Sequence, residues 1–150
     1  MGDVVGEEKS GTTRTKRGVL YVDGGCSGND QKRLGDRRMV MVVTDEHGTV
    51  LSETTTPGGS NNIAELYAVR DALQWCAHEH VAFVEIRTDS RNNFAWVLGK
   101  KIGKGINDRD AVLLAKARIA WLRERVTLKL VWVGREANVA GHYIEDKYGV

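Results

Sequence analysis

Apolar runs alternate with polar, glycine-containing breaks along most of the chain, and their spacing predicts an α/β fold. Strands are expected where β-branched and apolar residues cluster, over residues 19–23, 39–44, 49–55, 81–88 and 126–133. Helices are expected where apolar residues recur every three or four positions, over 61–77, 90–98 and 108–124, with a short final helix after Asn138. The predicted order is therefore βββαβααβα.

The connections between these elements predict how the strands pair. Asp45–Gly48 has the composition of a tight turn, so the second and third strands should form a hairpin with the first strand beside them. The last two strands are reached through helices, which favours parallel pairing. We expect a five-stranded mixed sheet, with three antiparallel strands plus two parallel ones, flanked by helices on its faces.

Three local features of this pattern are specific enough to check. The first strand should close at Gly24-Gly25, and Ser60 or Asn61 should cap the main helix. The helix over 108–124 should bury Leu114, Ala115, Ile119, Trp121 and Leu122. Trp96 and Trp121 each suit stacking on nucleic acid or packing in the core, and the core is the preferred assignment for Trp121.

Length and composition define a single domain. The 150 residues are 41% hydrophobic and 28% charged, which excludes a wholly disordered chain, collagen and fibrous repeats. Residues 1–17 are polar and aperiodic, so we expect a flexible N-terminal tail before a domain spanning 18–150.

The same composition limits location and assembly. No apolar run approaches the ~18 residues of a membrane span, and no secretory signal is present, so we expect a cytoplasmic protein without a membrane partner. The two cysteines, Cys26 and Cys76, are expected to be free thiols. Without heptads or a large apolar stripe, a monomer is expected.

Charge is distributed unevenly. The chain carries a formal net charge of +2, but residues 91–125 hold nine basic and three acidic residues, which leaves the remainder net negative. That division suits a protein that binds a polyanion on one surface and a cation on another. Solvated helix faces would give the same pattern.

Three carboxylates stand at positions where acidic residues are costly. Asp23 closes an apolar strand, Glu65 lies early in the main helix, and Asp89 closes the fourth strand. If the first and fourth strands are parallel neighbours, both aspartates emerge at one sheet edge, where converging carboxylates would bind hard divalent ions. Taken singly, Asp23 also suits a turn and Asp89 a helix cap.

The residues around these carboxylates carry a family resemblance. The blocks are Tyr21-Val22-Asp23-Gly24-Gly25-Cys26-Ser27-Gly28-Asn29, Ser60-Asn61-Asn62-Ile63-Ala64-Glu65-Leu66, Thr88-Asp89-Ser90 and Trp132-Val133-Gly134-Arg135-Glu136-Ala137-Asn138. They resemble, in order and on the expected elements, the motifs of type 1 ribonuclease H. The resemblance implies an endonuclease that cuts the RNA strand of RNA–DNA hybrids and leaves 3′-hydroxyl and 5′-phosphate ends. It implies that Asp23, Glu65 and Asp89 bind two Mg²⁺ ions.

The resemblance also implies residues that contact the substrate. Asn amides and loop N–H groups suit the wide minor groove, where 2′-hydroxyls distinguish RNA from DNA. Asn61 and Asn62 also suit simple helix capping. The implied nucleic-acid contacts are Gly24, Cys26, Asn29, Asn61, Asn62, Ser90, Lys100, Lys101 and Lys104.

The fourth active-site position departs from the family pattern. The family places an Asp four residues after the Asn of its last loop, and that count from Asn138 gives His142. An imidazole there would bind a metal ion, orient water or assist product release, and it makes Mn²⁺ a plausible alternative to Mg²⁺. Glu145 and Asp146 share the helical face of His142 and are the lower-ranked alternatives, and His142 also suits a simple surface position.

A second departure is the short connection over residues 99–107. Many family members carry an extra basic helix there, whereas this chain keeps only Lys100, Lys101 and Lys104 for phosphate contacts.

The sequence therefore predicts a hybrid-specific endoribonuclease. A catalytically weakened hybrid-binding module of the same fold is an alternative because the fourth carboxylate is missing. A related nuclease acting on another nucleic acid is a further alternative, since the fold does not fix the substrate.

Overall fold

The protein folds as a five-stranded mixed sheet with helices on both faces. The computed structural model describes residues 16–27, 37–99, 102, 106 and 108–150. The strands are β1 (Arg17–Ser27), β2 (Arg38–Asp45), β3 (Val50–Pro57), β4 (Phe83–Thr88) and β5 (Thr127–Trp132). The helices are α1 (Asn61–His78), α2 (Arg91–Val97), α3 (Arg109–Arg123) and α4 (Val139–Tyr148), with a 3₁₀ helix at Arg135–Ala137.

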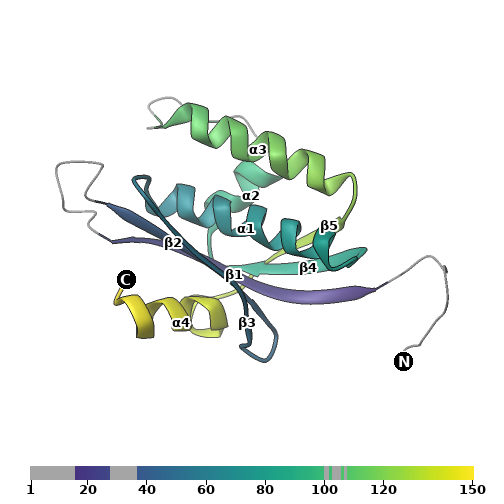
Figure 1. The fold of residues 1–150 in the computed structure, drawn as a ribbon, viewed down its shortest axis with the longest axis horizontal. Helices are drawn as coiled ribbons and strands as arrows, with labels where there is room; N and C mark the ends of the chain where they lie inside the picture. The colour runs from purple at the N-terminus through teal and green to yellow at the C-terminus, as the bar shows by residue number, and fades with distance from the viewer. Residues whose placement is uncertain (1–15, 28–36, 100–101, 103–105, 107) are drawn as a thin grey trace.

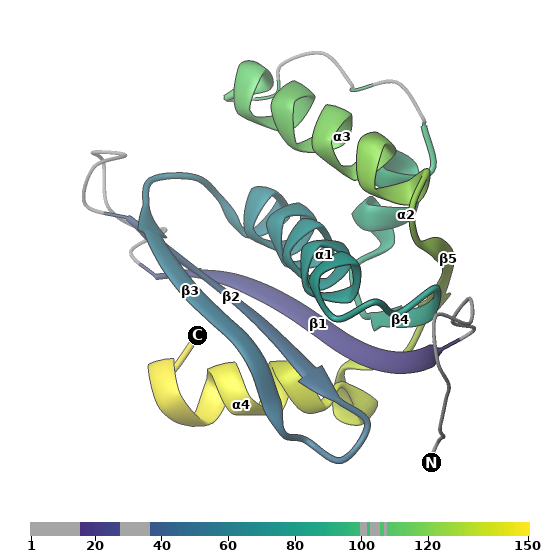
Figure 2. The same cartoon turned by 45° about the vertical axis from the view of Figure 1, so that its right-hand side comes forward.

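The predicted element order and strand pairing are confirmed. The sheet order is β3-β2-β1-β4-β5. The β1–β2 and β2–β3 pairs are antiparallel, whereas β4 pairs in parallel with both β1 and β5. Helices α1, α2 and α3 lie on one side of the sheet and α4 lies on the other (Figure 1). Turning the molecule shows α4 beneath β1 and β2 (Figure 2).

The two faces of the sheet carry cores of very different size. On the side of α1–α3, α1 buries one complete face against the sheet and α3, within a large cluster that includes Leu66, Leu73 and Ile86. On the α4 side, the buried cluster consists of Val40, Val42, Ala140 and Ile144. Most of the hydrophobic stabilisation therefore comes from the first layer.

The predicted apolar face of α3 is partly wrong. Trp121 is 42% exposed and Leu114 is 74% exposed. The buried residues are Val112, Ala115, Ile119 and Leu122, which follow one narrow helical stripe at spacings of three and four. Trp121 falls beside that stripe, whereas Trp96 of α2 is buried in the core.

A membrane-spanning role finds no support in the helices of the described residues, because none is both long and apolar enough to cross a bilayer.

Candidate active site

The site forms where β4 ends and β1 continues. The parallel pairing of these strands runs from Arg17↔Phe83 to Tyr21↔Arg87, and β4 stops at Thr88. Beyond that point β1 pairs only with β2 on its other side. This arrangement opens one edge of β1 at Asp23, directly beside Asp89.

The prediction that Asp23 closes its strand is wrong. Gly24 and Gly25 continue β1 and pair with Met41 and Val40, and the strand ends at Ser27. The antiparallel pairing with β2 keeps the two glycines in the strand. The local sequence, which resembles a turn, does not indicate this long-range pairing. Asp23 is therefore held inside a strand, which fixes its backbone more firmly than a turn would.

Helix α1 brings Glu65 to the same point. Ser60 caps the helix by accepting a hydrogen bond from the Ile63 N–H at 3.3 Å, which confirms one of the two predicted caps. Gly24 lets the helix approach β1 closely, because a Cβ there would lie 2.2 Å from the carbonyl carbon of Ala64. The Gly24 N–H donates to Glu65 Oε1 at 2.9 Å, so the same contact orients the carboxyl group.

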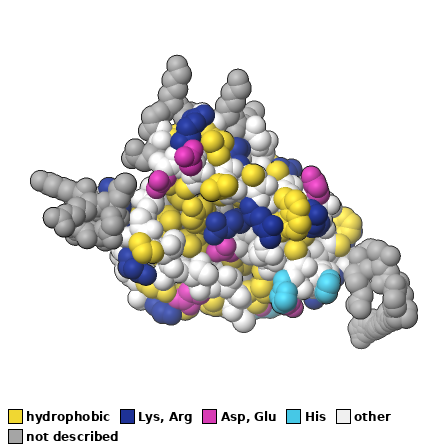
Figure 3. Space-filling view, turned by 45° about the horizontal axis from the view of Figure 1, so that its top comes forward, with side chains coloured by type: hydrophobic (Ala, Val, Ile, Leu, Met, Phe, Trp, Pro, Cys, Tyr) yellow, Lys and Arg dark blue, Asp and Glu magenta, His cyan; other side chains and the backbone are white. Residues whose placement is uncertain are grey.

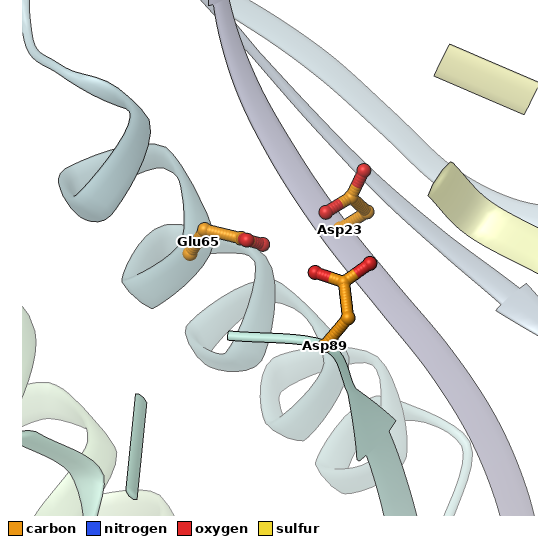
Figure 4. Close-up of side chains that lie close together, drawn as sticks. All are labelled: Asp23, Glu65 and Asp89. Carbon is orange, nitrogen blue, oxygen red and sulfur yellow. The ribbon is translucent and has the colours of Figure 1, made fainter. Parts of the chain in front are cut away.

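Three carboxyl groups from three elements converge on one point. One oxygen each from Asp23, Glu65 and Asp89 lies within 4.8 Å of the others. Figure 4 shows these side chains pointing toward one another from β1, α1 and the end of β4. Asp23 is 4% exposed and Glu65 9% exposed, while Asp89 is half-buried. This donor set, all oxygen and partly dehydrated, could hold a divalent cation.

The electrostatics of the cluster agree with this capacity. Burial, reinforced by the neighbouring Asp89 carboxylate, raises the pKa of Asp23 to about 6, although a hydrogen bond with Glu65 and the charge of Arg135 oppose the rise. Burial and the charge of Asp23 together raise the pKa of Glu65 strongly. Without a cation, the cluster therefore keeps a proton at neutral pH.

Asn138 connects Asp89 to two other parts of the site. Its side-chain Nδ2 donates to Asp89 Oδ2 at 3.1 Å and to the Val22 carbonyl at 3.0 Å. Its Oδ1 accepts from the backbone N–H groups of Ala140 and Gly141, which caps α4. One fully buried amide thus joins β1, the end of β4 and α4.

Asn93 makes a second connection, on the helical side of the sheet. Its buried Nδ2 donates to the Glu65 carbonyl and to Thr88 Oγ1, both at 3.2 Å. The Thr88 hydroxyl also accepts from the Ser90 N–H at 3.1 Å. The backbones carrying Glu65 and Asp89 are therefore tied together. Sequence reasoning missed this role because a helical Asn gives no sign of which carbonyl it will meet.

The candidate fourth residue, His142, lies on α4 at the rim of the site. His142 is exposed, and it is not among the three residues whose ligand atoms cluster within 4.8 Å in the described part of the chain. It shares a pocket of about 330 Å³ with residues from three segments: Asp89, Arg135, Glu136, Gly141 and Glu145. Glu145 therefore faces the same space, whereas Asp146 is not among the lining residues. Sequence reasoning had assigned no role to Arg135 or Glu136.

The predicted substrate residues fall into three groups. Cys26 and Asn61 are joined by a 2.8 Å hydrogen bond from the Cys26 N–H to Asn61 Oδ1, and Asn62 is exposed beside them. Ser90 is buried and caps α2 by accepting from the Asn93 N–H, and Gly24 lies beneath α1. Asn29, Lys100, Lys101 and Lys104 lie outside the described residues.

Some of the basic residues between positions 91 and 125 stabilise the fold. Lys116 donates to the carbonyl of Trp96, and Arg123 Nη1 donates to that of Val97 at 3.0 Å, so two α3 cations satisfy the end of α2. Arg118 donates to Gln74 Oε1 of α1. Lys and Arg side chains gather in the middle of the helical side of the molecule, among hydrophobic ones (Figure 3).

Comparisons with known proteins agree with this fold. A family model described as RNase H matches residues 15–141. The chain therefore belongs to the RNase H family, and its resemblance to the type 1 enzymes is confirmed. No curated protein matches the sequence.

Several solved structures share the fold. The N-terminal RNase H domain of a Mycobacterium tuberculosis protein is 23% identical, with a TM-score of 0.64, covering 85% of this chain and 94% of that one. LC11-RNase H1, isolated from compost by a metagenomic approach, is 28% identical, with a TM-score of 0.60, covering 87% of this chain and 93% of that one. LC11-RNase H1 has also been solved in complex with an RNA/DNA hybrid, in a structure 29% identical to this chain, with a TM-score of 0.53 and coverage of 80% and 87%.

Proposed function

We propose that this protein hydrolyses the RNA strand of RNA–DNA hybrids with the help of two divalent ions. The observation that carries the proposal is the cluster of Asp23, Glu65 and Asp89 oxygens within 4.8 Å, on an RNase H fold. The hybrid bound by LC11-RNase H1 supports the choice of substrate. The products would be 3′-hydroxyl and 5′-phosphate ends.

One further observation supports the binding of a hard cation by this set of carboxylates. Asp23 Oδ1 is buried and has no hydrogen-bond partner among the described residues, although a buried carboxylate oxygen ordinarily finds one. Mg²⁺ ions bound there would activate a water molecule and stabilise the leaving oxygen of the phosphodiester. Mn²⁺ is the alternative ion.

Each residue has a distinct part in this proposal. Asp23, Glu65 and Asp89 supply the negative charge that holds the ions against the substrate phosphate. His142 assists from the rim, as fourth ligand or by orienting water and product, because it shares a pocket with Asp89. Glu145 lines the same pocket and ranks second.

The substrate would be held by groups on both sides of the carboxylates. The exposed side chains of Asn61 and Asn62 start α1 beside Cys26, which suits contacts with the minor groove of the hybrid. Asn29, Ser90, Gly24 and the lysines at 100, 101 and 104 complete the proposed contacts.

A hybrid-binding module with weakened catalysis is the second candidate. It is favoured by two observations: position 142 carries no carboxylate, and His142 is exposed and lies outside the oxygen cluster. The intact cluster of three carboxylates favours the enzyme.

One experiment separates the two candidates. A labelled RNA–DNA hybrid is incubated with wild type, Asp89→Asn and His142→Ala, in Mg²⁺ and separately in Mn²⁺, with single-stranded RNA as control substrate. Hybrid-only cleavage that falls by orders of magnitude in Asp89→Asn is the expected result. Tight hybrid binding without cleavage in either metal would establish the binding module, and cleavage that survives Asp89→Asn would overturn the mechanism.

A further inference from the structure

An exposed tryptophan stands beside the carboxylate cluster. Trp132 ends β5 and is 46% exposed. Its backbone pairs in register with Thr88, and the Val133 N–H donates to the Thr88 carbonyl at 2.9 Å. The ring is therefore carried by the strand next to the one that positions Asp89.

An arginine lies over this ring. The guanidinium carbon of Arg91, two residues after Asp89, lies 4.7 Å from the centroid of the Trp132 indole. Arg91 is exposed, and no carboxylate in the described part of the chain forms an ion pair with it. Its charge is therefore available to an anion, unlike that of Arg87, which pairs with Glu85 at 2.7 Å.

Phe94 completes a hollow beside the stack. Arg91, Phe94 and Trp132 line a hollow of about 270 Å³. Two aromatic side chains and one cation with no ion pair among the described residues thus meet at a single surface position. An apolar surface with an adjacent cation suits a nucleotide, because its base or sugar covers the rings while its phosphate meets the charge.

We propose that Arg91, Phe94 and Trp132 form a nucleic-acid contact that holds one nucleotide of the substrate outside the cleavage position. The base or sugar lies against Trp132 and Phe94, and the phosphate is held by Arg91. This inference rests on the proposed function, and it goes beyond the substrate contacts that the resemblance implied, because Arg91, Phe94 and Trp132 were not among them.

The chain supplies a matched control. Trp121 of α3 is also exposed, at 42%, and also lies against arginines, with Arg118 at 4.3 Å and Arg125 at 3.4 Å from its ring centroid. Both arginines are engaged, because Arg118 donates to Gln74 and Arg125 to the Trp121 carbonyl. Trp121 thus reproduces the exposure and the cation contact of Trp132 without a free cation or a place beside the carboxylates.

The test compares Trp132→Leu, Arg91→Ala and Trp121→Leu with wild type. Hybrid binding is measured in EDTA with a fluorescently labelled RNA–DNA duplex, and steady-state cleavage of the same duplex is measured in Mg²⁺. Trp132→Leu and Arg91→Ala should each weaken binding about tenfold and raise KM, with kcat within about twofold of wild type. Trp121→Leu should match wild type.

Two further measurements exclude a merely structural effect. Arg91→Ala should reduce the slope of log affinity against log salt by about one, because one phosphate contact is lost. Trp132→Phe keeps an aromatic surface and should restore most of the affinity that Trp132→Leu loses.

The outcomes separate this inference from the proposed function. If wild type binds and cleaves the hybrid while Trp132→Leu and Trp121→Leu both match it, the contact at Arg91 and Trp132 is wrong and the function stands. If wild type neither binds nor cleaves the hybrid, the proposed function fails and this inference fails with it.

Discussion

The side-chain amide of Asn138 donates a hydrogen bond to Asp89 Oδ2 at 3.1 Å while its oxygen caps α4. The same amide nitrogen reaches the Val22 carbonyl beside Asp23. In the sequence, Asn138 is recognisable only as the last residue of a family motif. In the structure it fixes the orientation of one carboxylate and the start of the helix that carries His142.

Substitutions at Asn138 should separate these two roles. Asn138→Ala loses the cap and both amide donations, and it should cost about 2–4 kcal/mol of unfolding free energy. Asn138→Ser keeps a capping oxygen and should recover about 1 kcal/mol of that loss. Cleavage should stay equally low in both variants because neither donates to Asp89. Denaturant unfolding and hybrid cleavage check this, and cleavage that recovers along with stability in the Ser variant would reduce Asn138 to a cap.

The carboxylate cluster should make the metal-free protein less stable as pH rises. A carboxyl group whose pKa is higher in the folded state contributes most stability at low pH and loses it as pH rises through the folded-state pKa. For Asp23 that window runs from about 4 to about 6, and the raised pKa of Glu65 extends it upward. In EDTA, the unfolding free energy of Asp23→Asn should therefore exceed that of wild type by about 1–3 kcal/mol at pH 8 and by less at pH 5.

Divalent ions should reverse this order. Wild type should gain stability in Mg²⁺ or Mn²⁺, by about 2.7 kcal/mol at a hundredfold excess over the dissociation constant, while Asp23→Asn gains little. Thermal unfolding across pH, with and without metal, measures both effects. An equal metal response in the two proteins would place the binding site elsewhere.

Replacing His142 with the family's carboxylate should shift metal preference. His142→Asp offers a harder ligand on the same turn of α4, and we expect its cleavage to rise more in Mg²⁺ than in Mn²⁺. His142→Ala should lower cleavage about 10- to 100-fold in both metals. Ratios of kcat/KM in the two metals check this, with Asp146→Asn as a control on the same helix. An unchanged metal ratio in His142→Asp, together with wild-type kcat/KM in His142→Ala, would remove His142 from the site.

The close approach of α1 to β1 predicts that Gly24 tolerates no side chain. A Cβ at this position would lie 2.2 Å from backbone atoms of Ala64, so Gly24→Ala must push α1 and Glu65 away. We expect a loss of about 2–3 kcal/mol together with loss of cleavage. Gly18→Ala in the same strand is the control, since its Cβ would meet Val81 at an ordinary 3.5 Å. Equal unfolding free energies for the two variants would contradict the prediction.

Glu53 of β3 should anchor the far end of α4. It accepts hydrogen bonds from Tyr143 at 2.7 Å, from Lys147 at 2.8 Å and from Tyr148, and these donors lower its pKa to about 2. Glu53→Gln should cost about 1–2 kcal/mol at neutral pH. Because the pKa of Glu53 is lowered, its contribution is present above pH 4.5 and fades as pH falls toward 2. Urea unfolding at several pH values tests this, with Glu46→Gln at an exposed position as the control. If the unfolding free energies of the two variants depended on pH in the same way, the prediction would be contradicted.

Element order, strand pairing and the three carboxylates follow from the sequence because each has a local pattern. Alternating β-branched residues, helical periodicity and the Ser60 cap are properties of short segments. The parallel placement of β1 beside β4 then brings Asp23 and Asp89 together without further information.

The remaining features depend on partners that are distant in sequence. Gly24 and Gly25 stay in β1 because β2 pairs with them, and Trp121 is exposed because the buried stripe of α3 is narrower than its apolar content. The contacts of Asn138 with Val22 and Asp89 span 116 and 49 residues. No local pattern encodes such contacts.

The small cluster beneath α4 has a consequence for how the molecule opens. Helix α4 rests on a few buried side chains and the Glu53 anchor, whereas α1 is embedded in the large core. Local unfolding should therefore detach α4 well before the rest of the sheet, and its amide protons should exchange with solvent faster than those of α1. In such an opened form Asp23, Glu65 and Asp89 would stay on the folded scaffold while position 142 leaves them, so the rim of the site forms a separable cooperative unit.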